Sequence, residues 1–253
     1  SPLSPRGSSS KFRPNIRGLT VNWLWLVFQL PHLRRLIVYN YNMDTRGASE
    51  YSGNITKSST ITDLAIVYTN FQWALTNSMA FLSFPERLTK LSIYLECEDQ
   101  WDAIRQHKDS IEDLDLCLSD PCICCHNHDN LFLRPMREFR KLKKLDIQAT
   151  VIFNLQARFS LSDSLPHNLT SLAVYYVDKD FTLNKTLAQY LQEVIKSGEF
   201  PYLSDITLGA GLLLHYNRKD LLFSDEVKRA CEETGIVFEI KDVVFGDKAI
   251  EPR

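Results

Sequence analysis

The chain has 253 residues, 44% of them hydrophobic, so it can bury a sizeable core and is not expected to be disordered throughout. Its 29 basic and 31 acidic residues give a net charge of -2, which creates no global field to attract nucleic acid or an anionic membrane. No apolar run reaches the roughly 20 residues that a membrane-spanning helix needs, so we expect a soluble protein with neither kind of partner.

The first segment, residues 1–15, is predicted to be a flexible N-terminal arm. It begins SPLSPRGSSS, which lacks the apolar core of a signal peptide. Sequons at Asn54, Asn168 and Asn184 would permit glycosylation of a secreted protein, but such tripeptides are common by chance. Four of the six cysteines crowd into nine positions, unlike a disulfide framework. We therefore expect an intracellular protein, cytoplasmic or nuclear.

From residue 16 to residue 244, one apolar pattern recurs: an aliphatic residue, two variable residues, an aliphatic residue, one variable residue and a third aliphatic residue. This is the strand signature of leucine-rich repeats. The first aliphatic positions of successive clear copies lie 23 to 34 residues apart. The clear copies are Leu33-Leu36-Val38, Ile61-Leu64-Ile66, Leu88-Leu91-Ile93, Ile111-Leu114-Leu116, Leu142-Leu145-Ile147, Leu169-Leu172-Val174 and Leu203-Ile206-Leu208, with a weaker one at Ile16-Leu19-Val21 and a closing strand at Ile236-Phe238-Ile240.

Several stretches between these strands have apolar residues at helical spacing. Gly198 and Gly235 follow two of the stretches and are typical helix stops. The predicted helices cover Phe71 to Leu82, Gln100 to His107, Thr186 to Lys196 and Ser224 to Thr234.

A unit of one strand and one helix cannot bury its apolar face alone and must stack on the next copy. The sequence therefore predicts an α/β leucine-rich-repeat solenoid, curved, with parallel strands on the concave face and helices and loops on the convex face. It would contain about eight irregular repeats over residues 16–244, followed by a tail over residues 245–253. The alternative is an ordinary α/β domain with similar buried parallel strands. Against it, a proline returns just before the first aliphatic position in four places, at Pro31, Pro85, Pro166 and Pro201.

The phrases LPHLRRLIV, LPHNLTSLAV and FPYLSDITL resemble the repeats of F-box proteins of the leucine-rich-repeat type, especially divergent fungal ones. In that family the F-box docks on a ubiquitin-ligase adaptor and the repeats capture the substrate. The resemblance implies a substrate-recognition region, and an adaptor becomes a partner only if an F-box lies upstream. The fifteen residues before Ile16 are too few to hold one.

Side chains between the aliphatic positions should point away from the core and line the concave surface, where a protein partner would bind. Tyr39, Tyr94 and Tyr175 share one register, and tyrosine is favoured at binding hot spots, although exposed tyrosines are also tolerated on strands. Acidic positions would favour a basic partner peptide. The predicted contact residues are Arg35, Tyr39, Asp63, Lys90, Tyr94, Asp113, Asp115, Lys144, Asp146, Tyr175 and Asp205.

The segment CLSDPCICCHNHD, residues 117–129, is the main alternative to a protein-binding function. Zinc prefers four thiolate or imidazole ligands in a tetrahedron, and Cys122, Cys125, His126 and His128 could supply them. The segment lacks the two spaced ligand pairs of known zinc modules, so an ordinary inserted loop is the competing interpretation. No cofactor is expected apart from this zinc ion.

No other pattern predicts catalysis. The sequence has no glycine-rich phosphate loop, no nucleophile elbow and no helical pair of histidines. We therefore expect a non-catalytic protein, and an enzyme that uses the concave acids is the remaining hypothesis.

Overall fold

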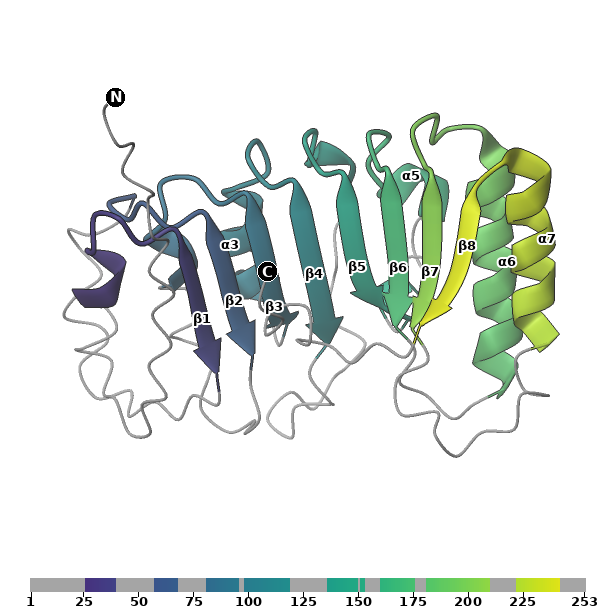
Figure 1. Cartoon of the computed structure of the whole chain (residues 1–253), viewed down its shortest axis with the longest axis horizontal. Coiled ribbons are helices and arrows are strands. Elements are labelled where there is room, and N and C mark those ends of the chain that lie inside the picture. The colour runs from purple at the N-terminus through teal and green to yellow at the C-terminus, as the bar shows by residue number, and fades with distance from the viewer. Residues whose placement is uncertain are drawn as a thin grey trace, which may run out of the picture.

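Eight β-strands form one sheet in which every strand is parallel to its neighbours and the strand order follows the sequence (Figure 1). The structure is a computed structural model that describes residues 26–39, 57–67, 81–95, 98–118, 136–149, 151–152, 160–175, 181–209 and 222–241. The strands are β1 (Arg35–Tyr39), β2 (Asp63–Val67), β3 (Lys90–Leu95), β4 (Asp113–Leu118), β5 (Lys144–Gln148), β6 (Ser171–Tyr175), β7 (Asp205–Gly209) and β8 (Val237–Lys241).

The helices connect successive strands. In Figure 1, α3 (Glu98–Arg105) and α5 (Leu161–Ser164) lie behind the sheet, while α6 (Phe181–Ser197) and α7 (Leu222–Thr234) stand beside β8. The 3-10 turn η3 (Met136–Glu138) precedes β5. Gly198 and Gly235 follow α6 and α7 with φ angles of 71° and 75°, a left-handed conformation that glycine adopts without strain. Three of the predicted helices are thus confirmed, with α6 beginning earlier than expected; of the fourth, only Phe81 and Leu82 are described, and both are helical.

The turns before the strands are joined by a repeated hydrogen-bond pattern. The carbonyl oxygen of the residue before each of the strands β1 to β6 accepts the N–H groups of two consecutive residues in the next unit, whereas the Ser204 carbonyl before β7 accepts from Val237 alone. Thr62 and Asp63 donate to Arg34, and Ser204 and Asp205 donate to Thr170, at 2.9 to 3.3 Å. Hydroxyl groups reinforce the pattern, as when Thr170 Oγ1 donates to the Lys143 carbonyl at 3.0 Å. Each unit up to β7 is therefore attached to its neighbour in the same way.

The aliphatic positions of the repeats form the core, together with the inward sides of the helices. Leu64, Leu114 and Leu145 in the central strands are fully buried. At the last strand, by contrast, Val237 is 57% and Ile240 44% exposed. Burial falls there because β8 pairs with a described strand on one side only.

The predicted α/β class with parallel strands is confirmed. The strictly sequential strand order differs from doubly wound folds, in which the order reverses at a switch point. A single winding direction with helices between strands is compatible with a solenoid. The weak copy at residues 16–21, the arm over residues 1–15 and the tail over residues 245–253 lie outside the described residues.

Candidate functional site

The candidate site is the side of the sheet that faces away from the core, here called the polar face. It consists of the first, third and fifth residues of the strands, because the second and fourth belong to the core that the helices share. Strand register arranges these residues in three rows that cross the sheet. The first row is Arg35, Asp63, Lys90, Asp113, Lys144, Ser171, Asp205 and Val237; the second is Ile37, Ala65, Ser92, Asp115, Asp146, Ala173, Thr207 and Glu239; the third is Tyr39, Val67, Tyr94, Cys117, Gln148, Tyr175, Gly209 and Lys241.

The first row alternates in charge over its first five strands. Arg35 Nε lies 3.4 Å from Asp63, and Lys90 Nζ lies 3.4 Å from Asp113. Opposite charges on adjacent strands favour this register over one shifted by a residue. The row therefore neutralises most of its own charge.

The second and third rows carry a buried polar network at the centre of the sheet. Asp115 and Asp146 are directly opposite one another on β4 and β5 and are only 7% and 5% exposed. Ser92 Oγ donates to Asp115 Oδ2 at 2.9 Å. Beside them, Cys117 Sγ donates to Gln148 Oε1 at 3.3 Å. Hydrogen bonds of this kind compensate part of the cost of burying carboxylates.

Tyr175 completes this network from β6. Its hydroxyl donates a hydrogen bond to Asp146, and burial, followed by the negative charge of Asp146, raises the pKa of the phenol. The phenol is therefore neutral at any physiological pH. Its ring lies against Gly209 on β7, where a Cβ atom would approach Tyr175 Cδ1 to 2.6 Å. Only glycine at this position leaves room for the buried ring.

The predicted contact residues thus fall into two groups. Those of the first row and Tyr94 are half-buried or exposed, as expected of a binding surface. Asp115, Asp146 and Tyr175 were expected on the surface as well, but they are buried: Tyr175 bonds to Asp146 and packs its ring against Gly209, and Asp115 accepts from Ser92. Of Tyr39, only the backbone in β1 is described. That any of these residues contacts a partner stays a prediction.

The predicted zinc ligands Cys122, Cys125, His126 and His128 lie outside the described residues. Within the part of the chain that the structure describes, there is no group of three or more histidine, cysteine or acidic side chains able to hold a metal ion. Cys117, at the start of the same sequence segment, is buried in the polar network.

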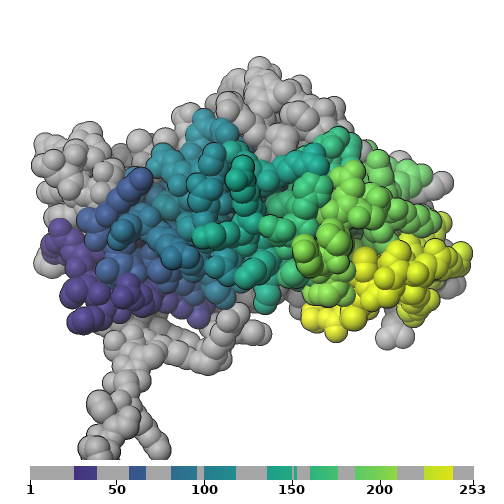
Figure 2. Space-filling view, turned by 90° about the horizontal axis from the view of Figure 1, so that it is seen from above, coloured from purple at the N-terminus to yellow at the C-terminus, as the bar shows by residue number. Residues whose placement is uncertain are grey.

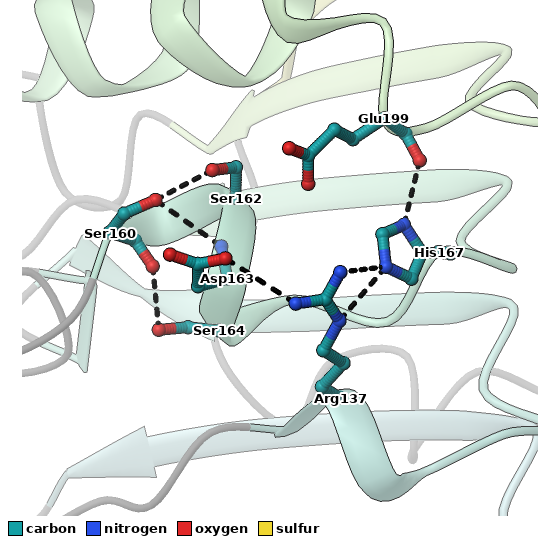
Figure 3. Close-up of polar contacts among 7 residues, drawn as sticks. All are labelled: Arg137, Ser160, Ser162, Asp163, Ser164, His167 and Glu199. Atoms are coloured by element: carbon teal, nitrogen blue, oxygen red, sulfur yellow. Dashed lines mark hydrogen bonds and ion pairs between the residues drawn. The ribbon is translucent and has the colours of Figure 1, made fainter.

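A second polar cluster lies at the amino ends of β5, β6 and β7 and was not expected from the sequence (Figure 3). Arg137 Nε donates to His167 Nε2 at 2.9 Å, and the opposite ring nitrogen, Nδ1, donates to the Glu199 carbonyl at 2.9 Å. The Arg137 guanidinium also contacts Asp163 at 3.3 Å, and Asp163 in turn donates its N–H to the helix-capping Ser160. The cluster joins the turns of three successive units, and the only sequence signal for it is the separation of its members by about one repeat.

None of the helices that the structure describes combines the length and apolar character required to cross a membrane. Comparison of the chain with protein-family models, with curated proteins and with solved structures found no match.

Proposed function

We propose that the chain is a non-catalytic scaffold of the leucine-rich-repeat type that binds a protein segment on its polar face. The observation that supports this most is the in-register alignment of eight strands, which presents rows of polar side chains on the side opposite the core. The helices α3 and α5 stand behind the strands, and α6 and α7 stand beside β8 (Figure 1). A broad strand face of this kind suits an extended partner.

The charges of the polar face favour a partner segment with basic side chains. Asp113 and Asp205 are partly exposed, and the two buried carboxylates of β4 and β5 lie near Asp113. On β1 to β3, Ile37 and Tyr94 are half-buried and pack around Ala65, which offers an apolar contact. Acidic residues outnumber basic ones, with Asp63, Asp113, Asp115, Asp146, Asp205 and Glu239 against Arg35, Lys90, Lys144 and Lys241.

The partner segment that fits this distribution places an apolar side chain over β1 to β3 and a lysine or arginine over β4 and β5. Adjacent strands are about 4.8 Å apart, so the two contacts lie within roughly four residues of an extended peptide. The resemblance to F-box proteins makes the sharpest version of the proposal the substrate-recognition region of a ubiquitin-ligase receptor. A ligase adaptor would join only through an F-box encoded upstream.

A peptide-display selection against the full chain tests the proposal. We expect enriched peptides to combine a basic and an apolar residue, and their affinity to fall at least about tenfold in the Tyr94→Ala and Asp113→Lys variants. The control carries Gln189→Ala and Lys196→Ala on the exposed side of α6 and should bind like the wild type.

Enriched peptides that lack basic residues, or that bind equally to the Asp113→Lys variant, would contradict the proposal. So would peptides whose affinity is lost in the α6 control, because they would occupy the helical side of the molecule.

A further inference from the structure

The turn that leads into β5 carries a run of basic side chains at the edge of the sheet formed by the amino ends of the strands. Figure 2 is viewed from above Figure 1 and therefore looks onto this edge. Met136, Phe139 and Leu142 are fully buried and anchor the turn at every third position. The residues between them consequently face solvent. Five of those at or after this turn are basic and exposed: Arg137, Arg140, Lys141, Lys143 and Lys144.

The end of α3 and the turn that follows it before β4 add two more cations to the same edge. Arg105 and Lys108 both bind the carboxylate of Glu138, with Lys108 Nζ at 3.2 Å. The hydrogen bond from Arg105, and to a lesser extent the one from Lys108, lowers the pKa of Glu138. One ionised acid is thus shared between two cations.

Counting ion pairs leaves an excess of positive charge in this region, here called the basic edge. Arg105 also binds Asp102 at 3.2 Å, Arg137 binds Asp163 at 3.3 Å and Lys143 binds Glu112 at 3.3 Å. The ion pairs of these seven bases involve only four acids, Asp102, Glu112, Glu138 and Asp163. The three bases that form no ion pair with a described residue are Arg140, Lys141 and Lys144.

We propose that the basic edge is a docking surface for a short acidic segment of a protein partner. Arg140 and Lys141, which form no ion pair with a described residue, are adjacent on the turn before β5, and the guanidinium of Arg140 can hold a carboxylate through two parallel hydrogen bonds. Oppositely charged groups at such a surface accelerate encounter and orient the partner. Arg140 and Lys141 do not belong to the polar face, so the inference stands apart from the function proposed above.

The length of the basic edge favours an acidic peptide over nucleic acid. Exposed acids lie in the neighbouring units, Asp109 in the turn before β4 and Asp163 in α5 before β6. A phosphodiester chain that continued along the edge would meet negative charge in both directions. The units that carry Asp109 and Asp163 are two strand spacings apart, which corresponds to about 10 Å, or about three extended residues. A few adjacent glutamate or aspartate side chains fit that length.

Fluorescence anisotropy with a labelled octaglutamate peptide and the full chain tests the inference. We expect binding at low salt that weakens as salt rises, and a loss of affinity of about tenfold or more in the Arg140→Glu/Lys141→Glu variant. The matched control is Lys228→Glu/Arg229→Glu on the exposed side of α7, which changes the net charge equally and should alter affinity by less than about twofold.

Neither Arg140 nor Lys141 contributes its side chain to the fold, so the variant should melt like the wild type. The milder Arg140→Gln/Lys141→Gln variant should still weaken binding and serves as a second test. Absence of octaglutamate binding to the wild type at low salt would overturn the inference, as would equal losses in the two charge-reversal variants. Tighter binding of a single-stranded oligothymidylate than of the peptide would overturn it in favour of a nucleic-acid surface. An Asp113→Lys variant should retain octaglutamate binding, which separates this result from a failure of the polar-face proposal.

Discussion

Replacing Gly209 by alanine tests the packing that buries Tyr175. The added Cβ would lie 2.6 Å from Tyr175 Cδ1, an atom close to the base of the ring that can move away only if the buried ring itself turns or shifts. Overpacking of this kind costs about 1 to 3 kcal/mol. Displacement of the ring would also weaken the hydrogen bond to Asp146, and bonds to charged groups contribute about 1.5 to 3 kcal/mol. Alanine in a strand gains only about 0.5 to 1 kcal/mol over glycine, so the net expectation with the hydrogen bond lost is a destabilisation of about 1.5 to 5.5 kcal/mol.

Urea unfolding of four proteins measures this effect: the wild type, Gly209→Ala, Tyr175→Ala and the double variant. Removing the ring removes the collision, so Gly209→Ala should be neutral or stabilising by up to about 1 kcal/mol in the Tyr175→Ala background. Unchanged m-values would establish that the same surface unfolds in all four. If alanine at position 209 destabilised both backgrounds equally, or stabilised the wild type, the close approach to Tyr175 would not be what requires glycine.

Three further outcomes follow from burial. Burial lowers the pKa of the His107 imidazole, whose Nε2 donates to the Leu82 carbonyl at 2.7 Å, so the folded state binds fewer protons than the unfolded state. The contribution of His107 to the free energy of unfolding should therefore be complete above the unfolded pKa of 6.5 and fall as the pH drops through that value. In the His107→Gln variant, the midpoint of urea unfolding should no longer show this fall. Leu114→Ala at the centre of the sheet should cost about 2 to 5 kcal/mol in urea unfolding, whereas Ile240→Ala at its exposed end should cost less than about 1 kcal/mol, and equal losses would contradict the proposed gradient. Burial raises the pKa of the Cys231 thiol to about 11, so native-state labelling followed by mass spectrometry should find it unmodified while the protein stays folded; modification at the rate of a free thiol would refute its burial.

The strands were predictable because their apolar pattern combines two periods. Leu114 and Leu116 alternate with Asp113 and Asp115, which identifies a strand with one apolar side, and the recurrence of the pattern every 23 to 34 residues identifies its neighbours. Aligning the copies even gives the correct partners across the sheet, such as Leu114 opposite Leu145. The glycine after α7 was equally informative, since a left-handed residue there ends the helix.

The sequence could not predict which polar-face residues are exposed. Tyr94 and Tyr175 occupy equivalent positions in their strands, yet Tyr94 is half-buried and Tyr175 is fully buried. The difference arises from Gly209, which lies 34 positions later and is adjacent only after the chain has wound once more. The contact of Arg137 with His167 has the same origin. Contacts between side chains of successive units depend on which residues the strands and turns align. A repeat length that varies from unit to unit leaves this alignment undetermined for the side chains outside the apolar pattern.

The uniform attachment of each unit through the carbonyl before its strand has an evolutionary consequence. Since the donor and acceptor groups at every junction belong to the backbone, they are supplied by any sequence that can form the turn. Whole units can therefore be duplicated, deleted or recombined at these junctions, while neighbouring units keep their attachments. Lineages carrying this architecture are free to change in length by complete windings, and selection on what the molecule recognises can act on one winding at a time.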